Sequence, residues 1–344
     1  MDEMNNGAHA GGERRTVVVT QRFFDAEAVA YLEANRCSVR IATLPPGQAD
    51  GALPEATLHA LLGDASGWIV GHANVSRSLL ERLKTLRVVA RRGVGYERVD
   101  LAAIRDLGMV ATVAVGGNDA CVADHALAMM LALGHRLRES QRRMEQGDWT
   151  ILPGQDLYRK NVGVIGLGRI GRAVVQRLRG FDANVMALTP NPSPQYGREN
   201  NIDYVDLATM LAQCDYVSLH APLTPETRLM IDAPALRRMR PGAFLINTAR
   251  GGLVNDADLL AALECGHLAG AGLDVFQSEA ERDPALQEVT RALLALPNVV
   301  ATPHAGASTR EGLERTNMIA ARCIVAALDG AAFPPSCLIA DGRT

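Results

Sequence analysis

A glycine-rich turn in the middle of the chain constrains the fold more than any other feature. The apolar run 161–165 leads directly into the spacing Gly166-x-Gly168-x-x-Gly171. A helical pattern follows, with apolar residues on one face at Ile170, Val174, Val175 and Leu178. Gly166 permits a tight turn, Gly168 lets the backbone approach phosphates, and Gly171 lets the helix pack close to the strand. The segment therefore predicts a strand–turn–helix unit that holds a pyrophosphate at the helix N-terminus. An ordinary tight turn is the alternative.

Short β-type runs alternate with helical patterns along the rest of the sequence. Before the glycine-rich turn, we expect strands at 16–20, 38–43, 68–71, 86–91 and 109–113, and helices at 23–35, 55–62, 79–84 and 101–107. From the turn onward, we expect six strands, at 161–165, 184–188, 216–220, 243–247, 270–275 and 298–302. This alternation predicts an α/β fold with parallel sheets covered by helices on both faces. Six such strands match a complete dinucleotide-binding fold.

Two long helical patterns, 119–146 and 309–328, flank the second series of strands. The first pattern is uninterrupted and connects two domains, and the second returns the chain to the first domain. A length of 344 residues suits two domains. We therefore expect a Rossmann dinucleotide-binding domain at 118–304, which includes the connecting helix. It is inserted into a substrate domain formed by 15–117 and 305–335.

Composition narrows the class of protein further. Hydrophobic residues make up 48% of the chain, and the net charge of −3 gives no reason to expect nucleic-acid or membrane binding. No apolar run approaches the length of a membrane span. The polar segment 1–14 lacks the apolar core of a signal peptide, so we expect a disordered tail there. The six cysteines are scattered, with no C-x-x-C pair, so we expect reduced thiols, no metal site and a cytoplasmic protein.

Five polar residues closely follow expected strands: His220, Arg250, Asp274, Glu279 and His304. Ligands of open parallel sheets bind outside the carboxyl ends of the strands, so these side chains can converge on one crevice. Each also has a simpler structural interpretation. His220 can cap a strand end, Asp274 can cap a helix, and His304 can be a hydrogen-bonded loop histidine. Arg250 and Glu279 can be solvated surface charges.

Together these residue types suit the oxidation and reduction of hydroxy acids. An arginine can hold a carboxylate and polarise a carbonyl. A histidine can move the hydroxyl proton, and a glutamate bonded to that histidine fixes its tautomer. The nicotinamide of a bound dinucleotide would carry the hydride itself.

Longer motifs give most of the chain, about residues 44–328, a resemblance to a known family. In order they are RRGVGYERVD, VADHALAMMLAL, VGVIGLGRIGRAV, LHAPLTPETR, NTARGGLVN, GAGLDVF and TPHAGAST. On these motifs the chain resembles the D-isomer-specific 2-hydroxyacid dehydrogenase family. The resemblance implies a Rossmann domain inserted into a flavodoxin-like substrate domain. It also implies an NAD(P)-dependent oxidoreductase that acts on a small 2-keto or D-2-hydroxy acid.

The resemblance also assigns roles to residues. Arg250 looks like the family's catalytic arginine, His304 like its acid/base histidine and Glu279 like the acidic partner of that histidine. The backbone of Val94 and Gly95 looks like the loop that receives the substrate carboxylate, together with Arg250 and His304. The expected cofactor contacts are Gly166, Gly168, Arg169, Ile170, Gly171, Thr189, His220, Ala221, Pro222, Thr248, Ala249, Arg250, Asp274, His304, Gly306 and Ala307.

Three positions depart from the family's pattern. Thr189 stands where NAD-dependent relatives carry an acid that binds the adenosine ribose, so the site suits NAD or NADP, with a lean toward NADP or dual use. Ala280 follows Glu279 where relatives often have proline, and the stretch 281–296 is longer than usual. Asp124 stands where relatives carry glutamate, which is a minor change between acids.

Substrate and assembly follow less directly from the sequence. The segment 69–74 lacks the arginine of phosphoglycerate dehydrogenases, and no room for a regulatory domain is expected after the return helix. Glyoxylate, hydroxypyruvate or another small 2-keto acid therefore fits better, with phosphoglycerate as an alternative. A second alternative is a non-catalytic, cofactor-dependent binding protein similar to the C-terminal-binding-protein corepressors. The helix around 122–133 resembles the family's dimerisation region and predicts a homodimer, whereas ordinary core packing is the simpler interpretation.

Overall fold

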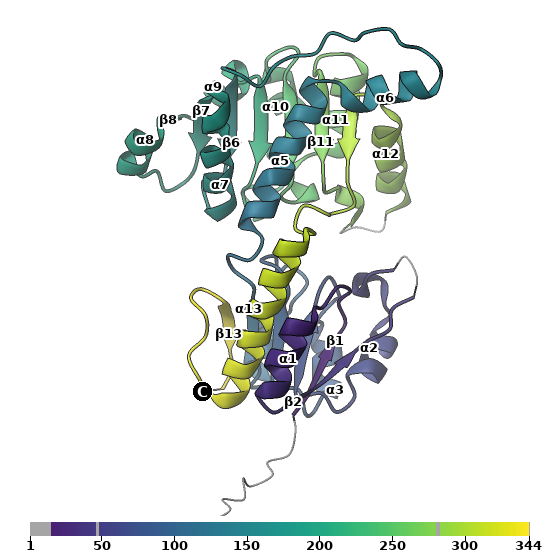
Figure 1. Ribbon diagram of the computed structural model, residues 1–344, viewed down its shortest axis with the longest axis vertical. Coiled ribbons are helices and arrows are strands. Elements are labelled where there is room, and N and C mark those ends of the chain that lie inside the picture. Colours follow the sequence, from purple (N-terminus) through teal and green to yellow (C-terminus); the bar gives the residue numbers. More distant parts are fainter. Residues whose placement is uncertain (1–14, 46–47, 280–282, 344) are drawn as a thin grey trace, which may run out of the picture. The chain divides into compact units, whose positions relative to one another are not determined.

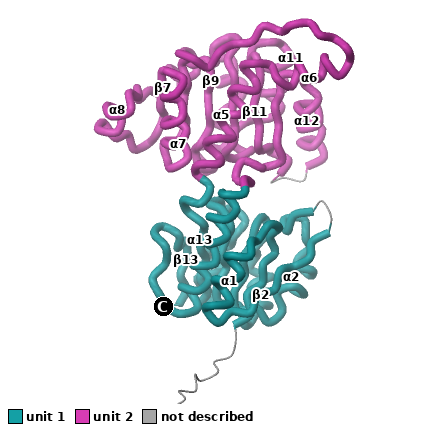
Figure 2. The backbone as a smooth tube through the Cα atoms, viewed as in Figure 1, with its two compact units in different colours: residues 1–118, 310–344 teal, residues 119–309 magenta. Residues whose placement is uncertain are grey.

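The computed structural model describes residues 15–45, 48–279 and 283–343 (Figure 1). The expected tail 1–14 and the departure at Ala280 lie outside the described residues. The chain divides into two compact units, coloured separately in Figure 2. One unit comprises the chain up to Asn118 and from Arg310 onward, and the other comprises Asp119–Thr309.

The first unit is built on a sheet with the order β13-β5-β4-β3-β1-β2. Its strands are β1 (Arg15–Val19), β2 (Cys37–Ile41), β3 (Gly67–Val70), β4 (Val88–Arg91), β5 (Val110–Val113) and β13 (Leu338–Asp341). Its helices are α1 (Ala26–Ala34), α2 (Glu55–Leu62), α3 (Arg77–Arg82), α4 (Leu101–Asp106) and α13 (Arg310–Asp329), with a 3-10 turn η1 (Asp50–Ala52). The five parallel strands run in the order 2-1-3-4-5, which is the flavodoxin-like arrangement.

Alternating side chains place two apolar cores on the two faces of this sheet. Val18 and Trp68 point toward α2, α3 and α4, whereas Val17, Val19 and Ile69 point toward α1 and α13. Both faces are therefore covered, as continuous apolar runs predict for parallel strands. The antiparallel edge strand β13 was not expected from the sequence. Its segment shows little apolar alternation, since Leu338 is exposed and Ala340 is buried.

The second unit holds a wholly parallel sheet with the order β12-β11-β10-β9-β6-β7-β8. Its strands are β6 (Asn161–Ile165), β7 (Asn184–Leu188), β8 (Ile202–Tyr204), β9 (Tyr216–Leu219), β10 (Phe244–Asn247), β11 (Gly270–Leu273) and β12 (Val299–Ala301). Counted from β6, the order is 3-2-1-4-5-6-7, which is the Rossmann order with one added strand. The structure thus confirms the expected α/β fold class. It adds β8, in which only Ile202 is buried.

Helices cover both faces of the second sheet. They are α5 (Asp119–Gly134), α6 (Leu137–Glu145), α7 (Arg169–Leu178), α8 (Pro194–Asn200), α9 (Leu207–Gln213), α10 (Ala233–Arg238), α11 (Asp256–Glu264) and α12 (Pro284–Ala295), with the 3-10 turns η2 (Arg179–Phe181), η3 (Gly251–Leu253) and η4 (Gln277–Glu279). Helices α5 and α7 pack on the face that bears Phe244 and Ile246, whereas α9 to α12 pack on the face that bears Leu245. None of the helices in the described residues combines the length and apolarity of a membrane span.

One expectation about the connecting helix is wrong. The pattern 119–146 was expected to form a single helix, but α5 ends at Gly134 and α6 begins at Leu137. Arg136 adopts left-handed backbone dihedrals, with φ of 53°. Gly134 lies against the backbone of Gln155, where an added Cβ would stand 2.7 Å from the carbonyl oxygen. The crossing of the chain segment at Gln155 therefore accompanies the break, and that contact is not visible in helical periodicity.

Candidate active site

The glycine-rich turn has the geometry that its spacing predicts. Gly166 has φ of 96°, and a Cβ there would stand 2.6 Å from the backbone nitrogen of Ala221. A Cβ on Gly171 would stand 2.1 Å from the carbonyl oxygen of Gly166. Gly168 faces open space, with no heavy atom within 4 Å of an added Cβ. Gly166 and Gly171 are thus required by the turn and the packing, while Gly168 leaves room for a ligand.

A cavity of about 470 Å³ lies at this N-terminus of α7. Its lining residues are Asp119, Leu167, Gly168, Arg169 and Arg172. Arg169 Nε donates to Asp119 Oδ2 at 2.6 Å, and the Arg172 guanidinium lies 4.4 Å from the ring centroid of Tyr196 on α8. Helix N-terminal N–H groups and the Arg172 guanidinium favour an anionic ligand here, whereas the charge of Arg169 is balanced by Asp119.

Two buried polar atoms near this turn fit a bound dinucleotide. His220 Nδ1 and Thr248 Oγ1, which follow β9 and β10, have no hydrogen-bond partner within the described chain. The His220 backbone lies beside Gly166, since a Cβ on Gly166 would stand 2.6 Å from the His220 carbonyl carbon. Leaving buried polar atoms unpaired is costly, so a ligand that bonds them would be favoured. Burial lowers the pKa of His220 to about 4, so its imidazole is neutral at physiological pH.

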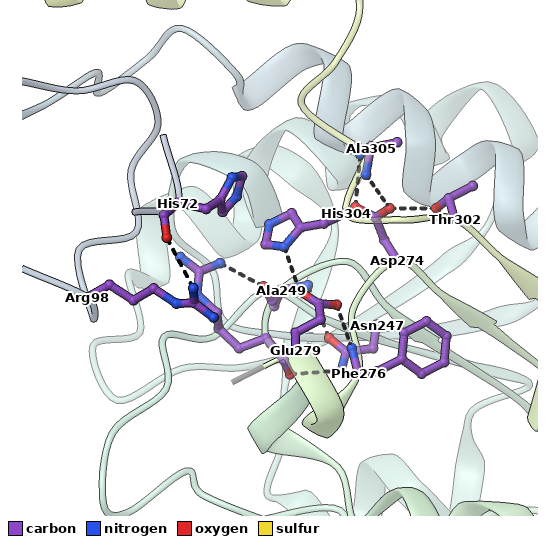
Figure 3. Close-up of polar contacts among 12 residues, drawn as sticks. His72, Arg98, Asn247, Ala249, Asp274, Phe276, Glu279, Thr302, His304 and Ala305 are labelled. Atoms are coloured by element: carbon purple, nitrogen blue, oxygen red, sulfur yellow. Dashed lines mark hydrogen bonds and ion pairs between the residues drawn. The ribbon is translucent and has the colours of Figure 1, made fainter. Parts of the chain in front are cut away.

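His304 and Glu279 form a hydrogen-bonded pair (Figure 3). His304 Nδ1 lies 2.9 Å from Glu279 Oε2, although the two residues come from different strand-end loops. Glu279 Oε1 also accepts the backbone N–H of Phe276 at 2.8 Å, which orients the carboxylate. Both side chains are about one-third exposed. Because Nδ1 is engaged by the carboxylate, Nε2 is the ring nitrogen suited to exchange a proton with a substrate.

Asp274 holds the loop that carries His304. It is 2% exposed, and its carboxylate accepts the Thr302 hydroxyl at 2.5 Å and the backbone N–H groups of Ala305 and Gly306 at 2.7 and 2.9 Å. Its carbonyl accepts the N–H of His304 at 2.9 Å. Burial raises the pKa of Asp274, but the hydrogen bonds that it accepts outweigh burial and hold the pKa below its ordinary value. Asp274 therefore supports the His304 loop and does not cap a helix.

Arg250 lies on a tight turn that Asn247 holds from both sides. Asn247 Oδ1 accepts the N–H of Ala249 at 3.1 Å, and its Nδ2 donates to the carbonyl of Arg250 at 2.9 Å (Figure 3). The next residue, Gly251, packs directly on the backbone of Phe276, where a Cβ would stand 2.1 Å from the carbonyl carbon and oxygen. The Arg250 loop and the Glu279 turn are thus in backbone contact.

The remaining predicted site residues are spread over both units. Val94 and Gly95 follow β4 in the first unit, with Val94 half-buried and Gly95 buried. In the second unit, Ala221 and Gly306 are buried, Ile170, Thr189, Ala249 and Ala307 are half-buried, and Pro222 is exposed. Asp124 pairs with Arg177 of α7, so the glutamate-to-aspartate departure preserves an acid that forms an ion pair.

Sequence reasoning missed several residues at these places. His125 Nε2 lies 2.8 Å from the Thr302 hydroxyl that binds Asp274. Arg172 lines the cavity at α7, and Asp256 bonds to Gln277 beside Glu279. Of these residues, only His125 lies in a motif that the sequence analysis noted, VADHA on the connecting helix. That motif gave no indication of the residue that His125 contacts. The others depend on contacts between segments far apart in sequence.

Comparison with known proteins adds a family to this geometry. The family model described as "D-isomer specific 2-hydroxyacid dehydrogenase, NAD binding domain" matches residues 127–306. The chain is 37% identical to the D-3-phosphoglycerate dehydrogenase of Mycobacterium tuberculosis over 83% of its length, but it spans only 53% of that relative. It is 35% identical to the glyoxylate reductase of Thermococcus litoralis, over 78% of this chain and 82% of that protein.

A solved structure is similar over almost the whole chain. It is the D-lactate dehydrogenase of Aquifex aeolicus in complex with NAD and lactic acid, with a TM-score of 0.79 and 27% identity. The match covers 92% of this chain and 96% of that one.

Proposed function

Because the chain belongs to the D-isomer specific 2-hydroxyacid dehydrogenase family, we propose that it catalyses reversible hydride transfer between a nicotinamide dinucleotide and a small 2-keto or D-2-hydroxy acid. The observation that carries this proposal is the His304–Glu279 pair at 2.9 Å. The Arg250 loop packs against the turn that bears Glu279, and the glycine-rich turn offers an anion site in the same unit.

The roles of the residues follow from their chemistry. A bound nicotinamide dinucleotide supplies the hydride that adds to the keto carbon. Arg250 binds the substrate carboxylate and polarises the keto group. In the reduction direction, protonated His304 gives its Nε2 proton to the keto oxygen and becomes neutral. Glu279 accepts the Nδ1 proton in a hydrogen bond and stabilises the imidazolium between turnovers. The backbone of Val94 and Gly95 receives the substrate carboxylate.

The substrate class is tested with a panel of 2-keto acids, each assayed with NADH and NADPH. Glyoxylate and hydroxypyruvate are the first members, because relatives carry those activities in their names. Phosphorylated keto acids also belong in the panel. Segment 69–74 has no arginine of its own. However, Arg98 donates to the carbonyl of His72 at 3.1 Å, so a guanidinium lies beside this segment (Figure 3). Tight cofactor binding without turnover of any member would favour the cofactor-dependent binding protein.

We further propose that the site accepts NADPH at least as well as NADH. Thr189 follows β7 without a carboxylate, and its Oγ1 accepts the N–H of Asn191 at 3.4 Å. The Arg172 guanidinium lies over Tyr196, on the helix that follows this segment, and also lines the cavity at Gly168. The Arg172 guanidinium, with Thr189 in place of an acid after β7, suits the 2′-phosphate of NADPH.

Replacing Arg172 by leucine is expected to raise KM for NADPH by about 10- to 100-fold, since a charge-assisted phosphate contact is lost. KM for NADH should change by less than about threefold. Arg198→Leu, which removes an exposed arginine from α8, the helix that bears Tyr196, serves as the control. Steady-state kinetics measure KM for NADPH and for NADH in each variant. A wild-type KM for NADPH tenfold above that for NADH would contradict the proposal.

We also propose a homodimer, but through a different surface from the helix first expected. The apolar residues of 122–133 lie in the core of the second unit, with Val122, Leu127 and Leu133 at most 6% exposed. By contrast, Trp149 and Ile151 in the segment after α6 are 76% and 89% exposed. Large exposed apolar side chains are typical of protein contacts, and a second copy of the chain can bury these two reciprocally.

The double variant Trp149→Ser/Ile151→Ser is expected to sediment as a monomer at micromolar concentration, whereas the wild type sediments as a dimer. Phe23→Ser is the control, because Phe23 is 72% exposed but lies in the other unit. Sedimentation velocity measures the species, and circular dichroism checks that the variants fold. A monomeric wild type would refute the dimer, and a dimeric double variant would refute this surface.

A further inference from the structure

Asp256 and Gln277 form a reciprocal pair of hydrogen bonds at the base of the turn that carries Glu279. The backbone N–H of Asp256 donates to Gln277 Oε1 at 2.8 Å, and the backbone N–H of Gln277 donates to Asp256 Oδ2 at 2.9 Å. Each residue therefore donates through its backbone N–H and accepts through its side-chain oxygen. The pair joins the first residue of α11 to the first residue of η4.

Capping α11 does not explain why an acid is buried at position 256. The helix is already capped by Asn255, whose Oδ1 accepts the N–H groups of Ala257 and Asp258 at 3.1 and 3.2 Å. Asp256 is 2% exposed. Burial raises its pKa to about 6, the bond from Gln277 opposes that rise, and the charge of Glu279 adds to it. Burying a carboxylate is unfavourable unless its hydrogen bonds are made. The hydrogen bond that offsets the burial of the Asp256 carboxylate is the one from the backbone N–H of Gln277.

From Gln277 the contacts lead directly to the His304–Glu279 pair. Within the same turn, the N–H of Glu279 donates to the carbonyl of Phe276 at 3.2 Å, and Glu279 Oε1 accepts the N–H of Phe276 at 2.8 Å. Gly251 packs on the other side of Phe276 without room for a Cβ. The segment Phe276–Glu279 is thus held as one piece between α11 and the Arg250 loop. Any movement of Gln277 moves the carboxylate that faces His304.

We propose that Asp256 and Gln277 are positioning residues that hold Glu279 against His304. The catalytic consequence of this inference rests on the proposed function, whereas its structural content does not. Misplacing a catalytic group by about 1 Å can cost about 100-fold in rate. Asp256→Ala is therefore expected to lower kcat by roughly 10- to 100-fold. Asp256→Asn should restore most of the activity, because the amide oxygen can still accept the N–H of Gln277.

The test follows the ring of His304 by NMR in protein with isotope-labelled histidines, with His304→Ala used to assign its signal among the eight histidines. Asp256→Ala, Gln277→Ala and Glu279→Ala should each move the Nδ1 resonance of His304 in the same direction, because each loosens or removes the hydrogen bond between Nδ1 and Glu279 Oε2. Asp256→Asn and the matched control Asn255→Ala, which removes only the cap of α11, should leave this resonance where it is in the wild type.

A double variant separates positioning from general loss of stability. Adding Asp256→Ala to Glu279→Ala should move the Nδ1 resonance no further and lower kcat no further, because residues that act through one another are not additive. A wild-type Nδ1 resonance in both Asp256→Ala and Gln277→Ala would overturn the inference. So would additive losses in the double variant. If the wild type turns over no 2-keto acid, the proposed function fails, and the Nδ1 resonance of His304 in these variants still decides whether Asp256 positions Glu279.

Discussion

Replacing His304 by alanine is expected to lower kcat for keto-acid reduction by about 10²- to 10⁴-fold. The loss follows from the proposed role, because the His304 imidazole is the ring that bonds to Glu279 and exchanges the proton. Asp274 would still hold the loop through Thr302 and the backbone. Cofactor binding should therefore persist with a dissociation constant within about tenfold of the wild type. Stopped-flow measurement of hydride transfer separates this chemical step from cofactor binding.

Two further variants, at His59 and Glu279, test whether the loss is specific to the His304–Glu279 pair. His59→Ala, which removes a half-buried histidine from α2 in the first unit, should leave kcat unchanged. Glu279→Gln should lower kcat in the wild type but not in the His304→Ala background, because Glu279 acts through the imidazole. Wild-type turnover in His304→Ala would reduce the pair to a structural hydrogen bond.

Much of the fold was predictable because local patterns and long-range packing agree. The segment Val162–Ile165 is fully buried, as an apolar strand in a parallel sheet requires, and the glycine spacing that follows has one geometric solution. Strand alternation then determined the α/β class, and the order of strands followed from the two known doubly wound arrangements. These features involve neighbours in sequence, so they can be read without knowing the tertiary contacts.

The elements that the sequence analysis did not predict depend on tertiary contacts, which the spacing of apolar residues along the chain does not indicate. Strand β8 buries only Ile202, and β13 pairs antiparallel with β5 through a register shift. The break at Arg136 accompanies the crossing of Gln155, and the α5 pattern carried no sign of it. Within the second unit, the apolar residues of 122–133 pack against α7 and the sheet, as the simpler interpretation of that pattern predicts. The homodimer itself stays a prediction.

The candidate site shows the same division. The rule that ligands bind at the carboxyl ends of strands was enough to group Arg250, Glu279 and His304 in sequence. The 2.9 Å contact between Glu279 and His304, across 25 positions of sequence, required the turn that Phe276 and Gln277 build. Residues such as Gln277 carry no chemical signal, since a half-buried glutamine is usually a surface residue. Their roles become visible only once both partners are placed.

Replacing Arg250 by alanine is expected to lower kcat/KM for the keto acid by roughly 10²- to 10³-fold. Part of this loss should appear as a raised KM, because the guanidinium binds the substrate carboxylate as well as polarising the keto group. The loop itself should persist, since Asn247 bonds the backbone of residues 249 and 250 and not the Arg250 side chain. The affinity for oxamate, an unreactive analogue of a 2-keto acid, measures the binding part alone.

Arg250→Lys distinguishes charge from geometry at this position. A lysine keeps the positive charge but cannot form the two parallel hydrogen bonds of a guanidinium, so oxamate affinity should recover more than kcat. Arg240→Ala is the matched control, because Arg240 pairs with Asp215 at a half-exposed surface site and should change kcat/KM by less than about twofold. If Arg250→Ala kept wild-type kcat/KM and oxamate affinity, its side chain would have a structural role, such as its bond to the carbonyl of Ala249, and no role in substrate binding. The carboxylate would then have to be bound by the Val94–Gly95 loop alone.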